Sequence, residues 1–281
     1  MDFRAGFSLI RPINCAMIGF AVLVGEFVSR PSQIPLLFSA FGYLTGFFVC
    51  AYSMVVNDYY DVEVDKVNQP QRPLPSGRIS LGGAYRLSVL MLVLGLAFAT
   101  LTRNPLAVLI ASLYAFLSWL YNSRAKKAGL IGNFIVASSL AIPFIYGGVI
   151  SGGSVLSSLL LLMASTAFFA GAGREVVKAM ADTSGDAKRG VRSVAMTYGM
   201  WPASLIGAAL FLLAVITSWV PLLLSLANQV YEIGVVLPDL VYVYLAVSIV
   251  RRPDAENALT VKRVALLGML IGLFVFIGGA L

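Results

Sequence analysis

The chain has 281 residues, of which 59% are hydrophobic and 12% charged, and its net charge is +7. Because soluble domains carry about a quarter charged residues, this composition excludes a disordered chain, an ordinary soluble enzyme and a nucleic-acid-binding domain. The sequence has no histidine, which removes the commonest general base and most zinc sites. Its two cysteines, Cys15 and Cys50, stand in apolar runs and form no redox motif.

The apolar residues gather in runs long enough to cross a bilayer, which takes about 20 residues. The charge-free run 128–173 is too long for one span, and the glycine- and serine-rich segment 147–154 divides it. The sequence therefore predicts an all-α, multi-pass membrane bundle of about nine transmembrane helices in one domain, 1–281. In chain order, the predicted spans are roughly 12–29, 34–56, 84–102, 105–122, 130–149, 155–173, 201–221, 230–250 and 264–281. The first span lacks a small-residue cleavage site, so we expect an anchor and not a removable signal peptide.

Positive charge indicates the orientation of the bundle. When the spans alternate, eighteen of the twenty Lys and Arg residues fall on the side of the N-terminus, and only Arg30 and Arg103 fall on the other. Since cytoplasmic loops are enriched in Lys and Arg, we expect the N-terminus in the cytoplasm. The loops near 57–82, 122–129 and 174–193 would then face the cytoplasm as well.

Acidic residues are scarce, and they gather where two of the predicted spans end on that side. In the first such segment Asn57, Asp61 and Asp65 are four residues apart, so on a helix they share one face. Like charges at this spacing repel one another, and no lysine intervenes before Lys66. The pattern predicts a cation among these oxygens.

The second acidic segment has the same character, because Glu175, Lys178, Asp182 and Asp186 follow spacings of three and four. Two oxygen-rich helix ends on one side of a bundle favour Mg²⁺, which usually binds through one or two carboxylates, several waters and substrate phosphate. The residues expected to be catalytic and to ligate Mg²⁺ are Asn57, Asp61, Asp65, Asp182 and Asp186.

Basic residues lie beside both acidic segments. Three prolines and a Ser-Gly turn within residues 69–80 exclude a helix there. This loop can fold back and place Arg72 and Arg78 over the carboxylates, where a guanidinium suits phosphate oxygens. Lys126 and Lys127 follow the fourth span on the same side. An anionic head bound through metal next to an apolar groove indicates a lipid diphosphate as substrate.

These residues resemble the UbiA superfamily of intramembrane prenyltransferases over nearly the whole chain. The NDxxDxxxD signature is matched by Asn57, Asp58, Asp61 and Asp65, the RPxxSG that follows it by Arg72, Pro73, Ser76 and Gly77, and the DxxxD signature by Asp182 and Asp186. Within the superfamily, the segments at 11–15, 121–133 and 174–178 are most similar to the archaeal digeranylgeranylglyceryl phosphate synthase branch. Alanines at 179 and 181 stand where that branch usually has more acidic residues.

The resemblance implies Mg²⁺-dependent transfer of a geranylgeranyl group from its diphosphate to the hydroxyl of geranylgeranylglyceryl phosphate in membrane ether-lipid biosynthesis. It also implies a central cavity that opens to the bilayer. The partners would be an isoprenyl diphosphate donor, a lipid-like acceptor and the lipid bilayer, with no nucleic acid.

Six residues are expected to bind the substrates: Arg72, Lys126, Lys127, Lys178, Arg11 and Asn14. Mg²⁺ would neutralise the leaving diphosphate, and Arg72 with Lys126 or Lys127 would share its remaining charge. Lys178 or Arg11 would hold the phosphate of the acceptor, and Asn14 would orient its hydroxyl.

Two other functions stay open at this point. A quinone-type prenyltransferase would use the same diphosphate site with an aromatic acceptor. A cation transporter would also use carboxylates on two helices, but near the bilayer midplane and not at helix ends. Two further acids, Glu26 and Asp239, stay unassigned, and Asp239 follows Pro238, so a broken helix or re-entrant loop could expose it.

Overall fold

The computed structural model describes residues 3–29, 35–152, 157–183 and 192–280. All regular elements in these ranges are helical. In chain order they are α1 (Phe3–Ile10), α2 (Pro12–Ser29), α3 (Leu36–Asn68), α4 (Leu81–Leu101), α5 (Pro105–Ser123), the 3₁₀-helix η1 (Ala125–Lys127), α6 (Leu130–Ile150), α7 (Ser158–Ala181), α9 (Val194–Tyr198), α10 (Met200–Leu223), α11 (Gln229–Arg251) and α12 (Ala255–Ala280).

Within these described ranges, nine helices are long and apolar enough to cross a membrane, which confirms the predicted bundle. Three of them continue well beyond the predicted charge-free runs: α3 continues to Asn68, α7 continues to Ala181, and α12 begins already at Ala255. Charged side chains do not end a helix when partners or water satisfy them. Residues 57–68 and 174–181, which the sequence suggested as parts of loops, are therefore helix ends.

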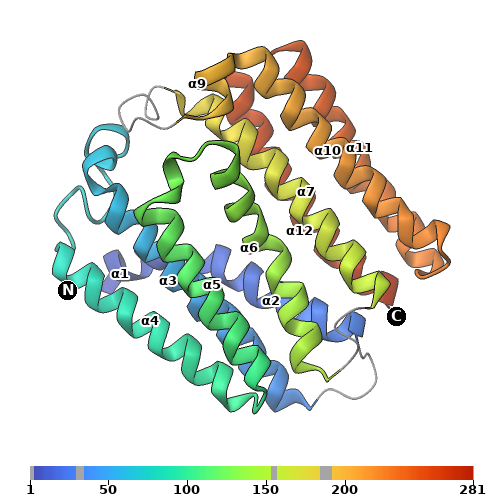
Figure 1. Ribbon diagram of the computed structural model, residues 1–281, viewed down its shortest axis with the longest axis horizontal. Coiled ribbons are helices and arrows are strands. Elements are labelled where there is room, and N and C mark those ends of the chain that lie inside the picture. Colours follow the sequence, from blue (N-terminus) through green and yellow to red (C-terminus); the bar gives the residue numbers. More distant parts are fainter. Residues whose placement is uncertain (1–2, 30–34, 153–156, 184–191, 281) are drawn as a thin grey trace.

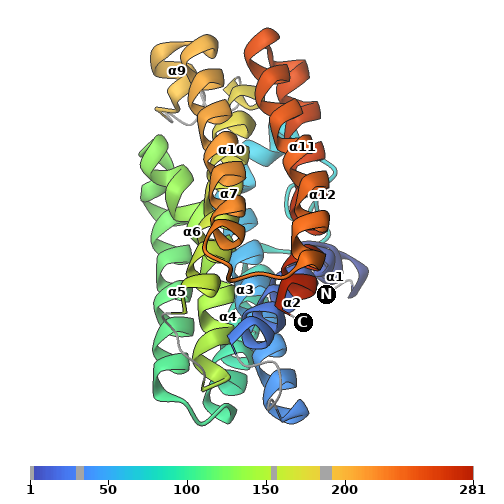
Figure 2. The same ribbon diagram turned by 90° about the vertical axis from the view of Figure 1, so that its right-hand side faces the viewer.

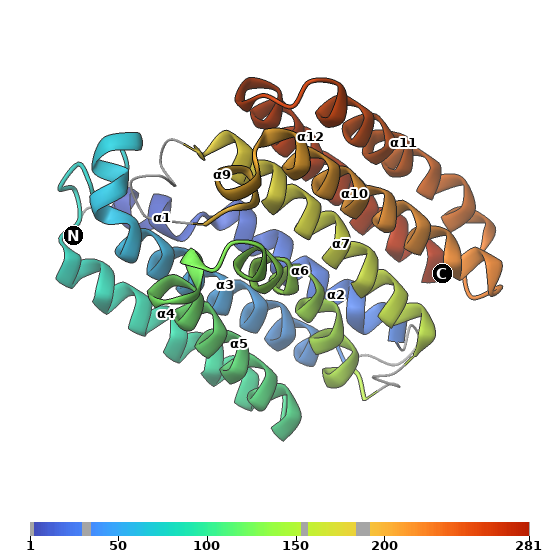
Figure 3. The ribbon, with the colours of Figure 1, turned by 45° about the horizontal axis from the view of Figure 1, so that its top comes forward.

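The spans pack against one another in a ring that closes between the last span and the first (Figure 1). Helices α2 to α5 pack together on one side, α7 and α10 to α12 pack on the other, and α6 lies between them against α2 and α7. Helix α12 contacts both α7 and α2, so the last span returns to the first. Figures 2 and 3 show that the short α9 lies at one end of the bundle, beside the end of α10.

Polar caps define where several spans begin. Ser80 accepts a hydrogen bond from the N–H of Gly83 at the start of α4 (3.1 Å). The side chain of Asn104 does the same for Leu106 at the start of α5 (3.0 Å), where Pro105 occupies the first helical position. Such side chains satisfy N–H groups that have no partner within the helix, so each helix starts at a fixed residue.

Helices α2 and α6 approach each other closely at two glycines. A Cβ at Gly25 would collide with the backbone of Phe144, and one at Gly147 would collide with the carbonyl of Val22. Membrane helices commonly pack closely through small residues of this kind. The contact fixes α6 against α2 and so helps to set the spacing of the two sides of the bundle.

The two unassigned acids are both buried within spans. Glu26 on α2 is 1% exposed, and its Oε1 has no hydrogen-bond partner among the described residues. Asp239 is 7% exposed and accepts a hydrogen bond from Ser218 (2.9 Å) beside an apolar cavity of about 100 Å³. Helix α11 continues through Pro238, so the broken helix or re-entrant loop considered for this segment is not observed.

Candidate active site

Helix α3 carries three buried aspartates on its last turns. Asp58, Asp61 and Asp65 are only 4%, 7% and 3% exposed. Their spacing of three and then four residues places them on one face of the helix. Burying a carboxylate is costly unless it is paired, and each of these three has a cationic partner that comes from another part of the fold.

The loop after α3 supplies the first partner. It turns back through hydrogen bonds from Ser76 N–H to the carbonyl of Arg72 (3.0 Å) and from Gly77 N–H to that of Leu74 (3.0 Å). Gly77 has a φ of +73°, which glycine adopts at little cost. Arg72 thereby contacts Asp65 at 2.6 Å and Asp58 at 3.5 Å.

Arg78 does not reach the carboxylates, contrary to the sequence-based expectation. Its guanidinium donates to the carbonyl of Gln71 (2.6 Å) and to the hydroxyl of Ser76 (3.1 Å). The residue is exposed and stabilises the loop through these two hydrogen bonds.

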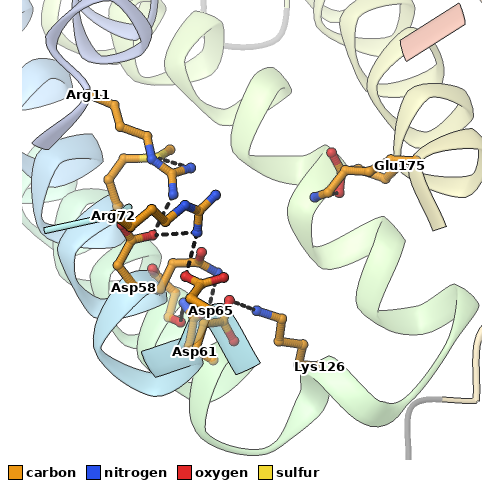
Figure 4. A network of polar contacts seen from close by, with 12 residues as sticks. Arg11, Asp58, Asp61, Asp65, Arg72, Lys126 and Glu175 are labelled. Atoms are coloured by element: carbon orange, nitrogen blue, oxygen red, sulfur yellow. Dashed lines mark hydrogen bonds and ion pairs between the residues drawn. The ribbon is translucent and has the colours of Figure 1, made fainter. Parts of the chain in front are cut away.

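Arg11 supplies a second cation and makes Asp58 the centre of the network (Figure 4). It stands between α1 and α2 with a φ of +51°, and its guanidinium forms an ion pair with Asp58. The same guanidinium lies 3.8 Å from the sulfur of Met54. Arg11, predicted to hold the acceptor's phosphate, is thus engaged with an α3 carboxylate. Asn14, one turn further along α2, is half-buried.

The end of α5 and the turn after it complete this side of the site. Lys126 in η1 forms an ion pair with Asp61. The side-chain amide of Asn57 donates to the Oδ1 of Asn122 (2.8 Å), and the Nδ2 of Asn122 donates to the carbonyl of Ser118 (2.8 Å). Asn57 is therefore held by α5. Lys127 belongs to the same turn, and its side chain lies outside the described part of the structure.

A second charged group lies on α7. Glu175 is 6% exposed and is held between Arg174 (3.0 Å) and Lys178 (2.8 Å). Asp182 follows the end of the helix, is 46% exposed, and lies 3.8 Å from the ammonium of Lys262 on α12. The predicted residue Asp186 lies outside the described residues.

The two groups occupy the same end of the bundle. Figure 4 shows Glu175 opposite the aspartates of α3, with Lys126 beside Asp61. The segments predicted to share one site therefore face each other.

The oxygen donors are the kind that Mg²⁺ prefers, although their present partners are cations. Among the described residues, no three acidic or cysteine side chains gather into a group that could hold a metal by themselves. Mg²⁺ normally needs only one or two protein carboxylates, because waters and substrate phosphate complete its shell. The chemistry of the site thus fits Mg²⁺ bound together with a diphosphate.

Sequence reasoning gave no role in the site to three residues of this network: Asp58, Glu175 and Lys262. The signal for Asp58 was present, because Asp58, Asp61 and Asp65 form a tighter helical stripe than Asn57 forms with the latter two. Glu175 was noted only for its spacing, and Lys262 has no local signal, since its neighbour Asp182 is far away in the chain.

Comparison with known proteins agrees with this architecture. Residues 18–273 match the UbiA prenyltransferase family. The chain is 36% identical to the digeranylgeranylglyceryl phosphate synthase of Methanocaldococcus jannaschii over 98% of this chain and 95% of that protein. It is 37% identical to the protein of the same name from Archaeoglobus fulgidus, over 99% and 95% of the two chains.

Solved structures show the same fold. One structure of a digeranylgeranylglyceryl phosphate synthase superposes with a TM-score of 0.79 at 34% identity, covering 99% of this chain and 98% of the other. A UbiA homologue from Archaeoglobus fulgidus, solved with GPP and Mg²⁺ bound, has a TM-score of 0.68 at 20% identity, covering 97% and 99%.

The helical bundle and its charged end define a multi-pass protein of the cell membrane with a polar site at one end of its spans. With a family match over most of its length and relatives above 30% identity that it covers almost completely, the chain belongs to the UbiA prenyltransferase family.

Proposed function

We propose that this protein transfers a geranylgeranyl group from geranylgeranyl diphosphate to the free hydroxyl of geranylgeranylglyceryl phosphate, with Mg²⁺ as cofactor. One observation supports this most directly. Three buried aspartates at the end of α3 meet three cations from separate elements, and a second charged group on α7 faces them. The similarity to full-length digeranylgeranylglyceryl phosphate synthases supports the choice of substrates.

The donor diphosphate would bind at the α3 side of the site. The residues we propose as catalytic and as holding Mg²⁺ are Asn57, Asp61, Asp65, Asp182 and Asp186. Bound there, Mg²⁺ would offset negative charge on the diphosphate as it leaves. Asp61 and Asp65 suit this role because they stand one turn apart on the same buried face.

Arg72 and Lys126 would bind the diphosphate oxygens directly. In the structure each is held at an aspartate, at Asp65 and Asp61 respectively. If those carboxylates were to hold a divalent cation, the two basic groups would lie beside it, where they could also bind phosphate oxygens. The fork of the Arg72 guanidinium can bind two oxygens at once. Lys127, in the same turn as Lys126, would add positive charge.

The acceptor would bind on the other side of the donor. Lys178 on α7 is 41% exposed and uses one contact of its ammonium on Glu175, so it can bind an anionic head group. We propose that Asn14 orients the acceptor's hydroxyl. Arg11 is paired with Asp58 and would act mainly by fixing that aspartate.

We also propose that residues 1–281 form one catalytic domain with its N-terminus and active site on the cytoplasmic side. The support is the distribution of positive charge. All basic residues of the network lie at the end of the bundle that carries the Lys- and Arg-rich segments, and cytoplasmic ends of membrane proteins are enriched in these residues.

A product assay tests the proposal. The purified protein in lipid nanodiscs would receive radiolabelled geranylgeranyl diphosphate with either geranylgeranylglyceryl phosphate or hydroxybenzoate or naphthoate, with and without Mg²⁺. We expect a Mg²⁺-dependent ether lipid product and diphosphate release. Product from the aromatic acceptors alone would show a quinone-type enzyme. The absence of diphosphate release with every acceptor would refute prenyl transfer and would leave the cation transporter as the remaining alternative.

A pair of variants from one helix end makes the assay specific. Asp61→Asn removes a buried carboxylate of the proposed metal site, and we expect turnover to fall by at least about 100-fold, the range found when one preorganised charge-stabilising group is lost. Glu63→Gln changes a residue two positions away whose side chain is 76% exposed and contacts only Lys66 among the described residues. Its turnover should stay within about twofold of the parent protein.

A further inference from the structure

A set of cations on α7 and α12 remains after the donor site is accounted for. On the α3 side, three aspartates are matched by Arg11, Arg72 and Lys126, so the described charges cancel. On the facing side, the cations Arg174, Lys178 and Lys262 surround only two acids, Glu175 and Asp182. Among the described residues this side therefore carries an excess positive charge.

Lys262 is tied into this set by two contacts. Its backbone carbonyl accepts a hydrogen bond from Nε of Arg174 (3.2 Å), and its ammonium lies 3.8 Å from Oδ1 of Asp182. Helix α12 packs directly on α7, so this lysine reaches α7 from the neighbouring helix. The side chain is 22% exposed and so is not fully enclosed by its neighbours.

Both lysines have donors to spare. An ammonium carries three N–H donors. Among the described residues, Lys178 makes one hydrogen bond, to Glu175 at 2.8 Å, and Lys262 makes one loose ion pair, with Asp182. Glu175 is buried and held by two cations, so it cannot turn away and fixes where Lys178 points. Each ammonium is thus held near a carboxylate and still has N–H donors that can bind a further anion.

We propose that Lys178 and Lys262 together form the binding site for the phosphate monoester of the acceptor lipid. The inference rests on the proposed function, because only a phosphorylated acceptor needs a phosphate-binding site. Arg174 acts as a positioning residue through the Lys262 carbonyl. Asp182 lies next to Lys262 and is also one of the residues proposed to hold Mg²⁺ at the donor site. If Asp182 were to bind Mg²⁺, Lys262 would lose its only described acidic partner and could bind the acceptor's phosphate.

The test compares two acceptors that differ only in the phosphate: geranylgeranylglyceryl phosphate and geranylgeranylglycerol. Lys262→Gln removes the charge, Lys262→Arg keeps it, and Arg263→Gln is the matched control, because this neighbouring residue on α12 is exposed and carries the same charge. Each variant is assayed in nanodiscs at saturating donor, and kcat/KM is measured for both acceptors.

We expect Lys262→Gln to lower kcat/KM about 10- to 100-fold for the phosphorylated acceptor, the effect of losing one charged hydrogen bond. The value for the alcohol should change by less than about threefold, and the KM for the donor should stay constant. Lys262→Arg should recover most of the loss, and Arg263→Gln should match the parent protein.

The proposed phosphate-binding site would be overturned by an equal loss of kcat/KM for both acceptors, by a raised KM for the donor, or by no loss of kcat/KM at all. These results differ from a failure of the proposed function, in which the parent protein itself makes no product from the glycerol ether lipids. If Lys262→Gln does not fold, the ratio of the two acceptors is read from Lys178→Gln instead, and an unchanged ratio there overturns the proposal as well.

Discussion

The contact between Arg72 and Asp65 allows a quantitative test of how the charged end of the bundle is held. Arg72 lies 2.6 Å from Asp65, whose side chain is 4% exposed. Replacing Arg72 with Gln leaves Asp65 buried without a cationic partner among the described residues, whereas Asp58 still has Arg11. Stranding one member of a buried ion pair costs about 3–5 kcal/mol. Since Arg72 is 25% exposed and water can enter, we expect about 3 kcal/mol.

The second variant needed is Asp65→Asn, alone and together with Arg72→Gln. The double variant has no stranded charge, so its loss should be smaller than the sum of the two single losses by about 2 kcal/mol. The measurement is unfolding in mixed micelles titrated with SDS, followed by tryptophan fluorescence. Lys66→Gln is the control, because its pair with Glu63 is exposed and should contribute less than about 0.5 kcal/mol. Losses that add within about 0.5 kcal/mol would show that Arg72 and Asp65 are not coupled and would refute the reasoning.

Three further predictions concern the metal, the donor site and the packing of the spans. Chelation with EDTA should abolish product formation and added Mg²⁺ should restore it, because the site offers only oxygen donors; full activity in EDTA would contradict the proposed cofactor. Lys126→Gln should lower kcat/KM for the donor about 10- to 100-fold through one lost charged contact, and an unchanged value would remove this lysine from the site. In thermal unfolding, Gly25→Ala should lose about 1–3 kcal/mol, because its Cβ meets the backbone of Phe144. Gly82→Ala, with open space around it, should gain about 0.5–1 kcal/mol, and equal effects of the two would disprove the close contact of α2 and α6.

Much of the fold could be predicted from the sequence, because spans are encoded locally. An apolar run long enough to cross a bilayer and its flanking charges can be read without knowing the neighbouring helices. The acidic stripe at the end of α3 and the turn that brings Arg72 back to Asp65 are local in the same sense. They depend on helical spacing and on prolines and a glycine within a short segment.

Two pairings that the sequence did not predict depend on tertiary contacts. Arg11 reaches Asp58 only because the chain breaks between α1 and α2, where Arg11 has a φ of +51°. Lys262 reaches Asp182 only because α12 packs against α7. No local pattern encodes either pairing, so Arg11 was assigned to the acceptor's phosphate, and Lys262 looked like an ordinary positive charge at the end of a span.

The length of α3 determines how deep the aspartates lie relative to lipid head groups. From Leu36 to Asn57 the helix is free of charged residues, which corresponds to about 33 Å at 1.5 Å per residue and matches a hydrocarbon layer of about 30 Å. The aspartates therefore begin where the phosphates of surrounding lipids lie. Isoprenoid substrates can present their polar ends at this level while their tails remain dissolved among the acyl or isoprenoid chains. Their turnover would then follow their mole fraction in the two-dimensional lipid phase, and diluting them with inert lipid would slow the reaction even at constant bulk concentration.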